Sequence, residues 1–456
     1  MLATPAARAP LPEARYAPPR RLLLIAFHYP PANASGTLRS LKFTRYLPQF
    51  GWEASVLTAP AECHESVDPR LVEEIPPQVS VHRAFCVSSQ RAFSVRGHYP
   101  AFTAVPDRYI SWLPFGVWQG LRAVRRERID ALLSTSPVQT AHLIAYLLNT
   151  VTGLPWVADF RDPWGGNEPR GRIRLRVERW MESCVVRRAN QIVGTTPEFI
   201  EDLCQRVGSD LRHKAVAIYN GYDDADFGEV DLSTTSGAQF VITHAGQLNP
   251  GFRHPGPFLR AVGLGLGRGT LPTTTRIRLL GSGPMAGDAS LQQVLVDLGL
   301  QARVEVVERM PYGDALRAMS TSSALLLLQG GQGTRAQIPN KAFEYLRLGR
   351  PILCLATPNS ATARVMREFD GVFLAEPDDV EGIARALNRL LDAWRRGQRV
   401  FDRQANGVSR YSRSEAARKL AEVLDRFVPQ THPAQASAAA PNLNHHDTID
   451  EASVAR

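Results

Sequence analysis

The residues best suited to bind an anion stand at the start of one expected helix. A buried apolar strand, Ala324–Gln329, leads into a glycine-rich loop, and a helix follows from about Ile338. The free N–H groups and the dipole of a helix N-terminus favour an anion such as a diphosphate. Lys341 lies near that positive end, where a lysine disfavours the helix alone but suits a bound anion. This arrangement predicts a diphosphate site at the helix start.

The same helix carries further polar side chains on one face. Asn340, Glu344 and Arg347 are spaced so that they share this face. Pro339 fits the first turn, and Gly349 fits the C-terminal cap. Glu344, one turn in, is placed to accept hydrogen bonds from ribose hydroxyls. A surface helix with a polar outer face is the simpler alternative, and composition alone does not choose between the two.

Two series of alternating apolar strands and helices must position these residues. The expected strands are Arg21–Phe27, Glu53–Leu57, Ala131–Ser134, Trp156–Phe160 and Gln191–Gly194, then Phe240–Ala245, Arg276–Leu280, Arg303–Val307, Ala324–Gln329 and Pro351–Ala356. A polar stretch rich in Ser and Thr, 228–238, separates the two series. The pattern predicts an α/β fold of two doubly wound domains facing a cleft, with ligands beyond the C-terminal strand ends.

The composition is that of an ordinary globular chain with a positive charge. Of 456 residues, 53 are Lys or Arg and 44 are Asp or Glu, which gives a net charge of +9. Such an excess attracts phosphorylated metabolites, an acidic membrane or nucleic acid, but no nucleic-acid motif accompanies it. Five cysteines without a Cys-x-x-Cys pair suit a reducing compartment and argue against a cysteine metal site. No apolar run approaches the roughly 20 residues that span a bilayer, so we expect a cytoplasmic protein.

The segment 330–353 resembles the donor-site helix of the family-4 glycosyltransferases, which have the GT-B fold of two Rossmann-like domains. The shared pattern is a glycine-containing loop, Lys341, a Phe-Glu-Tyr triplet around Glu344, and Gly-x-Pro-Ile from Gly349. The resemblance implies that Glu344 holds the ribose of a nucleotide-diphosphate sugar, the co-substrate. Many members have a second Glu eight positions earlier that faces the sugar. Ala336 stands there in this chain, which leaves the sugar itself open.

The resemblance extends to the loop Phe27–Thr37, after the first strand. Family members approach the donor phosphates with a glycine of this loop, and Gly36, flanked by Ser35, matches it. A residue without Cβ lets backbone N–H groups come close to a ligand. The sequence Tyr-Pro-Pro from Tyr29 resembles members that build bacterial surface polysaccharides. A plain turn between strand and helix would suit the same residues.

The loop His244–Pro255 matches the place where many members carry an Arg and a Lys that neutralise the diphosphate leaving group. Gln247 stands at the Arg position and Arg253 at the Lys position. An arginine such as Arg253 can hold a phosphate with two hydrogen bonds. Because Gln247 brings no charge, another arginine would have to assist, and Arg335 is the candidate.

The strand Trp156–Phe160 ends at Arg161 and Asp162, where many members have His, often followed by Asp. Arginine does not act as a base in proteins, so the resemblance assigns Arg161 to orienting groups or stabilising charge. Asp159 or Asp162 would then contact the acceptor hydroxyl. The alternative is an internal Arg–Asp pair that fixes the loop. Trp164 would either stack on a sugar ring or pack in the core.

Two other motifs are interpreted as structural. The stretch Gly281–Gly287 mimics a dinucleotide fingerprint, but its third glycine is one position late, so no nicotinamide cofactor is expected. The Asp-x-Asp at Asp224–Asp226 mimics the metal-binding motif of other glycosyltransferases. It resembles a turn segment of family 4, whose members generally need no metal in the site. We therefore expect neither a metal nor another cofactor.

Two basic stretches suit contact with an acidic membrane. They are the arginines of 170–188 and the aromatic and basic segment Trp112–Arg128. Ordinary helices with solvated arginines are the alternative. With membrane contact, the protein would be peripheral on the inner face of the membrane.

The resemblance covers about Arg20 to Phe427. We expect a disordered segment at 1–19, an acceptor-side Rossmann-like domain at 20–228 and a donor-binding one at 229–407. A C-terminal helix at 408–429 would pack back on the first domain, before a disordered tail at 430–456. This helix begins near Ser412 with a possible capping box.

The expected activity is sugar transfer from a nucleotide-diphosphate sugar to a hydroxyl of a sugar or lipid-linked acceptor. The resemblance implies retention of anomeric configuration and a place in polysaccharide or glycolipid biosynthesis. Two alternatives stay open. One is a nucleotide-sugar epimerase of GT-B fold, and the other is a non-catalytic GT-B subunit that binds a partner. The departures at Gln247, Ala336 and Arg161 keep the second alternative open.

Overall fold

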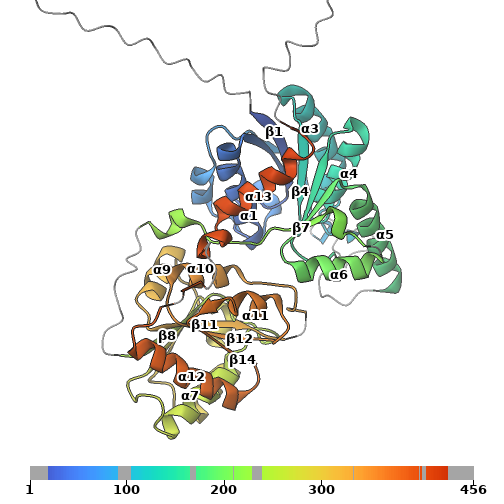
Figure 1. Ribbon diagram of the computed structural model, residues 1–456. Coiled ribbons are helices and arrows are strands. Elements are labelled where there is room, and N and C mark those ends of the chain that lie inside the picture. Colours follow the sequence, from blue (N-terminus) through green and yellow to red (C-terminus); the bar gives the residue numbers. More distant parts are fainter. Residues whose placement is uncertain are drawn as a thin grey trace, which may run out of the picture.

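The computed structural model describes residues 19–90, 104–164, 171–208, 210–228, 239–331, 333–399, 401–402 and 407–429. Within these residues the chain forms two α/β domains, each built on a parallel sheet (Figure 1). The segments expected to be disordered, apart from residue 19, and the linker from residue 229 onward lie outside the described part. The two-domain, doubly wound fold is as the sequence predicts.

The first domain contains a seven-stranded sheet in the order β3-β2-β1-β4-β5-β6-β7, and every neighbouring pair is parallel. The strands are β1 (Arg20–Ala26), β2 (Trp52–Thr58), β3 (Val81–Arg83), β4 (Ala131–Thr135), β5 (Trp156–Phe160), β6 (Gln191–Gly194) and β7 (Ala215–Ala217). The helices are α1 (Ser35–Tyr46), α3 (Trp112–Glu127), α4 (Thr140–Thr152), α5 (Arg172–Arg188) and α6 (Pro197–Val207). The central strands are almost wholly buried because helices cover both faces of the sheet.

The second domain contains a six-stranded parallel sheet in the order β10-β9-β8-β11-β12-β14. The strands are β8 (Val241–Ala245), β9 (Arg276–Leu280), β10 (Val304–Val307), β11 (Ala324–Gln329), β12 (Ile352–Ala356) and β14 (Val372–Ala375). The helices are α7 (Gly256–Gly267), α8 (Ala289–Asp297), α9 (Tyr312–Ser320), α10 (Asn340–Leu348), α11 (Ala361–Met366) and α12 (Val380–Arg395). Two short strands, β13 (Phe369–Asp370) and β15 (Phe401–Asp402), pair antiparallel beside this sheet.

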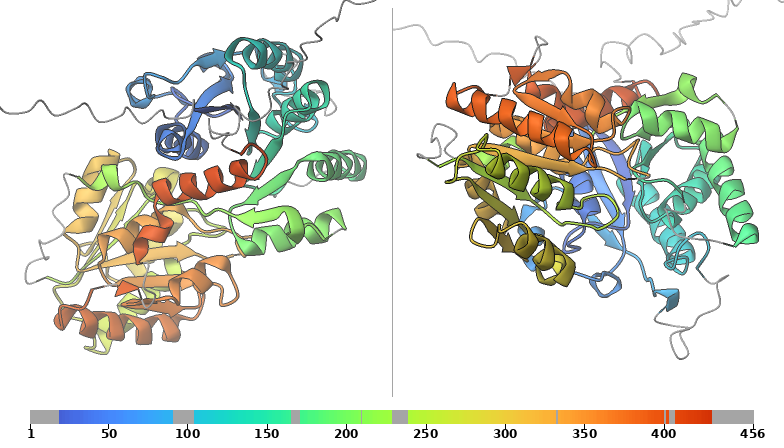
Figure 2. Two further views of the ribbon diagram at one scale, coloured as in Figure 1. Left: turned by 45° about the horizontal axis from the view of Figure 1, so that its top comes forward. Right: turned by 90° about the horizontal axis from the view of Figure 1, so that it is seen from below.

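The last helix, α13 (Arg413–Asp425), returns to the first domain and lies along α1 (Figures 1 and 2). The hydroxyl of Ser412 accepts a hydrogen bond from the backbone N–H of Glu415 at 3.1 Å and so caps the helix. Leu420 and Leu424 are buried in one apolar cluster with Leu24 of β1. The chain therefore crosses between the domains a second time before it ends.

No helix in the described ranges is both long and apolar enough to cross a membrane. The strands β3, β7 and β14 are absent from the sequence prediction. Each has three or four residues, and their side chains are half-buried or exposed, so they lack the buried apolar run by which the other strands are recognised.

Candidate active site between the two domains

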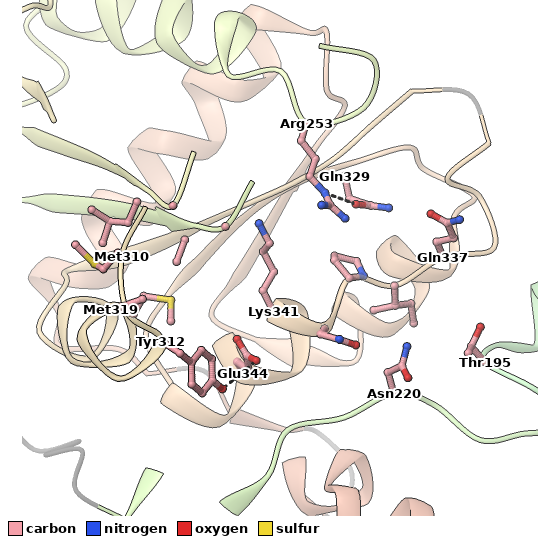
Figure 3. Close-up of a pocket in the computed structure, with 18 of the residues that line it drawn as sticks. Thr195, Asn220, Arg253, Met310, Tyr312, Met319, Gln329, Gln337, Lys341 and Glu344 are labelled. Carbon is pink, nitrogen blue, oxygen red and sulfur yellow. Dashed lines mark hydrogen bonds between the residues drawn. The ribbon is translucent and has the colours of Figure 1, made fainter. Parts of the chain in front are cut away.

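A cavity of about 550 Å³ lies where the two domains meet. Strands of both sheets end at it: Arg161 follows β5, Gly246 follows β8 and Gly281 follows β9. The first domain also contributes Thr195 and Asn220, opposite the second-domain residues in Figure 3. Both domains thus present their carboxyl strand ends to one space, where doubly wound sheets bind ligands.

The N-terminus of α10 faces this cavity. The helix begins at Asn340, so Pro339 precedes the first turn instead of lying within it. No described side chain caps this end, and the first turn holds no acidic residue. Asn340, Lys341 and Glu344 line the cavity, and Gly349 (φ 68°) ends the helix, as the sequence predicts. The helix therefore offers its positive end to a ligand.

Lys341 is aimed by a buried histidine. His244 Nδ1 lies 2.8 Å from the carbonyl oxygen of Leu326, so this nitrogen carries the proton and donates it. The other ring nitrogen, Nε2, is then an acceptor for Lys341 Nζ, 3.1 Å away. Burial is the main cause that lowers the pKa of Lys341 to about 7, and the positive charge of Arg253 is the second cause. His244 thus fixes the direction of the Lys341 amine, and the lowered pKa means that this amine loses its proton easily.

Gly246 allows this arrangement. Its backbone has φ 116°, and a Cβ placed there would lie 2.6 Å from Lys341 Nζ. A side chain at this position would displace the lysine or strain the loop. The backbone after β8 is therefore shaped around the amine.

Arg253 is the second cation of the cavity. Its Nε donates to Gln329 Oε1 at 3.3 Å (Figure 3), and burial lowers its pKa. Arg253 and Lys341 repel each other, and an anion between them would relieve that repulsion. This pair suits a diphosphate.

Glu344 lies one turn along α10. Tyr312 donates its hydroxyl proton to Glu344 Oε1 at 3.1 Å (Figure 3). Burial raises the pKa of Glu344, and the hydrogen bond from Tyr312 opposes that rise. Its carboxylate is thus oriented and accessible from the cavity, as a group that accepts hydrogen bonds from hydroxyls must be.

Arg161 and Asp162 line the opposite side of the cavity. The backbone N–H of Arg161 donates to Ser136 Oγ at 2.9 Å, and its Nη1 donates to the carbonyl oxygen of Gly36, also at 2.9 Å. Burial raises the pKa of Asp162, and Arg161 opposes that rise. Gly36 packs closely at this contact: a Cβ there would lie 3.2 Å from Arg161 Nη1 and 3.1 Å from the His28 ring, so these side chains would have to shift slightly.

Asp159 has a different place from the one considered in the sequence. Its side chain is 1% exposed, and it is not among the residues that line the cavity. Arg39 donates two hydrogen bonds to its carboxylate, at 3.0 and 2.8 Å, and Thr135 donates one at 2.8 Å. Burial alone would raise the pKa of Asp159, but Arg39 lowers it. The Arg39–Asp159 pair anchors the end of β5 in the core, so Asp159 holds the strand in place and does not face the ligand.

Three further sequence candidates, Gln247, Arg335 and Trp164, do not line the cavity. Ser35 is the first residue of α1, and its side chain lies outside the described part of the structure. Gln247 is exposed and lies against Gly283. Arg335 pairs with Asp202 of the first domain at 3.0 Å. Trp164 is buried and stacks on His142, which leaves it packing in the core.

Several lining residues are absent from the sequence prediction. Tyr312 begins α9, Gln329 ends β11, and Thr195 follows β6. None belongs to a motif, and only the fold brings them together. Asn220 also lines the cavity, and it belongs to an Asn-Gly pair just before the Asp-x-Asp turn, a pair that is typical of turns.

The Asp-x-Asp sequence forms a turn of 3-10 helix, Asp224–Phe227. Asp224 pairs with Arg347 at 2.8 Å, and Asp226 Oδ2 lies 3.4 Å from the Tyr312 hydroxyl, whose single proton points mainly to the nearer Glu344. Among the described residues, no group of three or more His, Cys, Asp or Glu side chains is arranged to hold a metal ion.

Comparisons with solved structures agree with this architecture. Anabaena HepE, crystallised with UDP and glucose, is 15% identical, with a TM-score of 0.59 over 89% of this chain and 100% of its own. The lipopolysaccharide outer core galactosyltransferase WaaB is 13% identical, with a TM-score of 0.56 over 89% and 99%. A candidate UDP-N-acetylglucosamine 2-epimerase from Listeria monocytogenes is 15% identical, with a TM-score of 0.51 over 91% and 98%. No curated protein matches the chain.

Two family models match the sequence, one on each domain. Residues 39–226 match Glycosyltransferase Family 4, and residues 239–393 match Glycosyl transferases group 1. Together they span most of the described chain. The protein therefore belongs to the family-4 glycosyltransferases and is an enzyme of the GT-B fold.

Proposed function

We propose that the cavity between the domains binds a nucleotide-diphosphate sugar and that the enzyme transfers this sugar to an acceptor hydroxyl. The observation that carries the proposal is the pair of cations, Lys341 and Arg253, at the uncapped N-terminus of α10. The UDP and glucose bound by HepE make UDP-sugars the first donors to test.

In the proposed reaction, the bond between the anomeric carbon and the diphosphate breaks while the acceptor oxygen bonds to that carbon. Negative charge grows on the departing diphosphate oxygen. Lys341, Arg253 and the N–H groups of α10 stabilise this charge because they are already in place. Glu344, oriented by Tyr312, accepts hydrogen bonds from the ribose.

The acceptor approaches from the first domain. Asp162 is placed to accept a hydrogen bond from the acceptor hydroxyl and to take up its proton as the new bond forms, and Arg161 holds the loop in position. The family assignment supports retention of anomeric configuration. Proton NMR of the first product formed from an α-linked donor tests it, since an α-linked product is expected and a β-linked product would contradict retention.

We propose that the reaction needs no metal, because Lys341 and Arg253 can neutralise the diphosphate themselves. Transfer should then proceed at the same rate with a chelator as without one. A rate that falls with the chelator and returns with Mg²⁺ or Mn²⁺ would contradict this point.

Sugar transfer by variants tests the site. Arg253→Ala should lower turnover and Glu344→Ala should weaken nucleotide binding, each by roughly tenfold or more, since each loses a hydrogen bond to or from a charged group. Arg268→Ala is the matched control, because Arg268 pairs with the exposed Glu381 outside the cavity. Wild-type transfer by both cavity variants would show that the site is elsewhere.

The epimerase alternative has one observation in its favour, the likeness to the Listeria protein. Incubating the enzyme with UDP-sugars in the absence of an acceptor separates the two activities. Isomerised donor would favour the epimerase, whereas unchanged donor that is consumed once an acceptor is added favours the transferase. The described residues offer no observation that favours a non-catalytic subunit.

We further propose that the enzyme works in polysaccharide or glycolipid assembly at an anionic membrane. Ile173, Val177 and Trp180 share one exposed face of α5, where Arg172 and Arg176 are also exposed. Such a combination of apolar and basic side chains suits the surface of acidic lipids.

Sedimentation with vesicles tests the membrane contact. The protein should bind phosphatidylglycerol vesicles and not phosphatidylcholine vesicles, and Trp180→Ser should weaken the binding. Val296→Ser, at an exposed apolar position of the other domain, is the control. Equal binding of wild type and Trp180→Ser would contradict the assignment.

A further inference from the structure

A second cavity, of about 800 Å³, lies within the first domain. It is lined by residues of the loops that follow β1, β2 and β4, among them His28, His64 and Val138. Its volume is within the range of small-molecule sites. The reaction described above does not use it.

Two histidines in this cavity have hydrogen-bonding capacity that the described residues do not match. His64 is 7% exposed, and neither of its ring nitrogens has a hydrogen-bond partner. His28 Nδ1 is also buried without a partner. The two rings lie 5.7 Å apart, and Phe27 packs edge-on against both. Buried polar atoms are nearly always hydrogen-bonded, so this pair needs a further partner.

The two histidines are neutral. Burial is the main cause that lowers the pKa of His28 to about 3 and the pKa of His64 to about 4. A neutral imidazole has one donor and one acceptor nitrogen. A hydroxyl group also donates and accepts, so a ligand with several hydroxyls matches such a pair better than an anion does.

The charged residues of this cavity are already paired. Arg108 bonds to Glu65 and to Gln90, the latter at 3.1 Å. Arg174 bonds to Glu178 at 2.8 Å. Asp107 accepts hydrogen bonds from Thr140 and from the backbone of Tyr109. No described cation of this cavity is left to hold a phosphate, which favours an uncharged ligand.

The cavity adjoins the donor site at one residue. Gly36 lies between His28 and Arg161. A Cβ built on Gly36 would lie 3.1 Å from the His28 ring and 3.2 Å from Arg161 Nη1. Arg161 belongs to the donor cavity and His28 to the second one. A ligand beside His28 would therefore lie next to the side of the donor cavity that carries Arg161 and Asp162.

We propose that this second cavity binds the acceptor as an uncharged carbohydrate whose hydroxyls hydrogen-bond to His64 and His28. The hydroxyl nearest Gly36 is the one that reacts. This inference rests on the proposed function, since it names the class of the acceptor.

Saturation-transfer NMR on the full chain with saturating UDP tests the proposal. The probes are methyl glycosides of glucose, galactose, mannose and N-acetylglucosamine. At least one should receive saturation from the wild type. The signal should fall at least about fivefold in His64→Phe, which keeps the ring against Phe27 but loses both nitrogens. His213→Phe, at an exposed position of the same domain, should behave as the wild type.

The outcomes separate this inference from the proposed function. UDP binding by calorimetry should be the same in wild type and His64→Phe, which also shows that the variant is folded. If UDP binds but no glycoside gives a signal, or the signal persists in His64→Phe, the acceptor assignment is wrong and the donor site stands. Binding of inorganic pyrophosphate to this cavity in place of glycosides would overturn it too. If UDP does not bind the wild type, the proposed function fails first.

Discussion

Among the single residues of the donor cavity, Lys341 decides the charge, because its amine can be protonated or neutral. His244 can only accept a hydrogen bond from Lys341, because its other nitrogen donates to Leu326. Burial and Arg253 hold the pKa of Lys341 at about 7, well below that of a solvated lysine. A bound diphosphate would raise this pKa, since an opposite charge favours the ammonium form.

This coupling predicts how UDP affinity depends on pH. Below about pH 7 the free enzyme already holds the proton on Lys341, so affinity is full. As pH rises further, binding must take up a proton, and affinity should fall by up to about tenfold per pH unit. Calorimetry from about pH 7 to pH 9, above the range where phosphate titrates, measures this. Lys341→Met should bind more weakly at all these values and with no slope, and a flat wild-type profile would contradict the account.

Tyr312 provides a second test at this scale. Its hydroxyl orients Glu344, and its loss leaves the carboxylate with a higher pKa and less fixed direction. Tyr312→Phe should weaken UDP binding severalfold, less than Glu344→Ala does, because the carboxylate itself remains. If Tyr312→Phe binds UDP more weakly than Glu344→Ala, the tyrosine itself contacts the ligand and our role for it is wrong.

The residue types in α10 predicted the site better than those of the other cavity segments. Lys341, Glu344 and Gly349 could be placed from the sequence because helix ends have strong local chemistry. Asp159 could not be separated from Asp162 in this way. Asp159 lies near the end of β5 and Asp162 just after it, and only the contact with Arg39, 120 positions away in the chain, shows that Asp159 is the buried one.

At the scale of elements, the loop after β8 and the start of α10 form one unit. Gly246 passes so close to Lys341 that no side chain fits between them. Gly246→Ala should weaken UDP binding by at least about fivefold while the protein still folds, because the new methyl group displaces Lys341 or strains the loop at a cost of roughly 1–3 kcal/mol.

The matched control is Gly267→Ala at the end of α7, where a Cβ would meet nothing within 4 Å. Binding and the melting temperature are measured for both. If both variants bind UDP equally well, the loop does not shape the site.

Elements were predictable where they are long and buried. The central strands match their expected bounds to within about one residue, since each is an apolar run between polar turns. The short edge strands β3 and β7 gave no such run, and their pairing with longer neighbours holds them in the sheet. The cavity residue Tyr312 could not be predicted, because only the order of strands brings α9 beside α10.

At the scale of the whole molecule, side chains fix how the two domains face each other. Arg364 of α11 makes two hydrogen bonds to Glu198 of α6, at 2.6 and 3.1 Å. Thr196, which caps α6, donates to the carbonyl oxygen of Ala336 at 2.7 Å. Arg413, the buried first residue of α13, lies near enough to Arg161 and Glu344 to influence charge on both sides of the cavity.

Loosening this junction should affect turnover more than donor binding. Arg364→Met removes the pair with Glu198, while Lys341 and Arg253, the residues proposed to hold the diphosphate, both belong to the second domain. We expect kcat to fall severalfold and the Kd for UDP to change by less than about twofold, because a partly exposed pair contributes roughly 1 kcal/mol or less. A larger Kd for UDP with an unchanged kcat would contradict the view that the second domain alone binds the donor and the junction affects only turnover.

We propose that the diphosphate of the donor lies between Lys341 and Arg253 at the start of α10. A crystal structure with whichever of UDP, GDP and ADP raises the melting temperature most would test this directly. We expect diphosphate oxygens within about 3 Å of Lys341 Nζ and of the Arg253 guanidinium, with the ribose hydroxyls hydrogen-bonded to Glu344. A nucleotide bound elsewhere, or one whose phosphates point away from both cations, would contradict it.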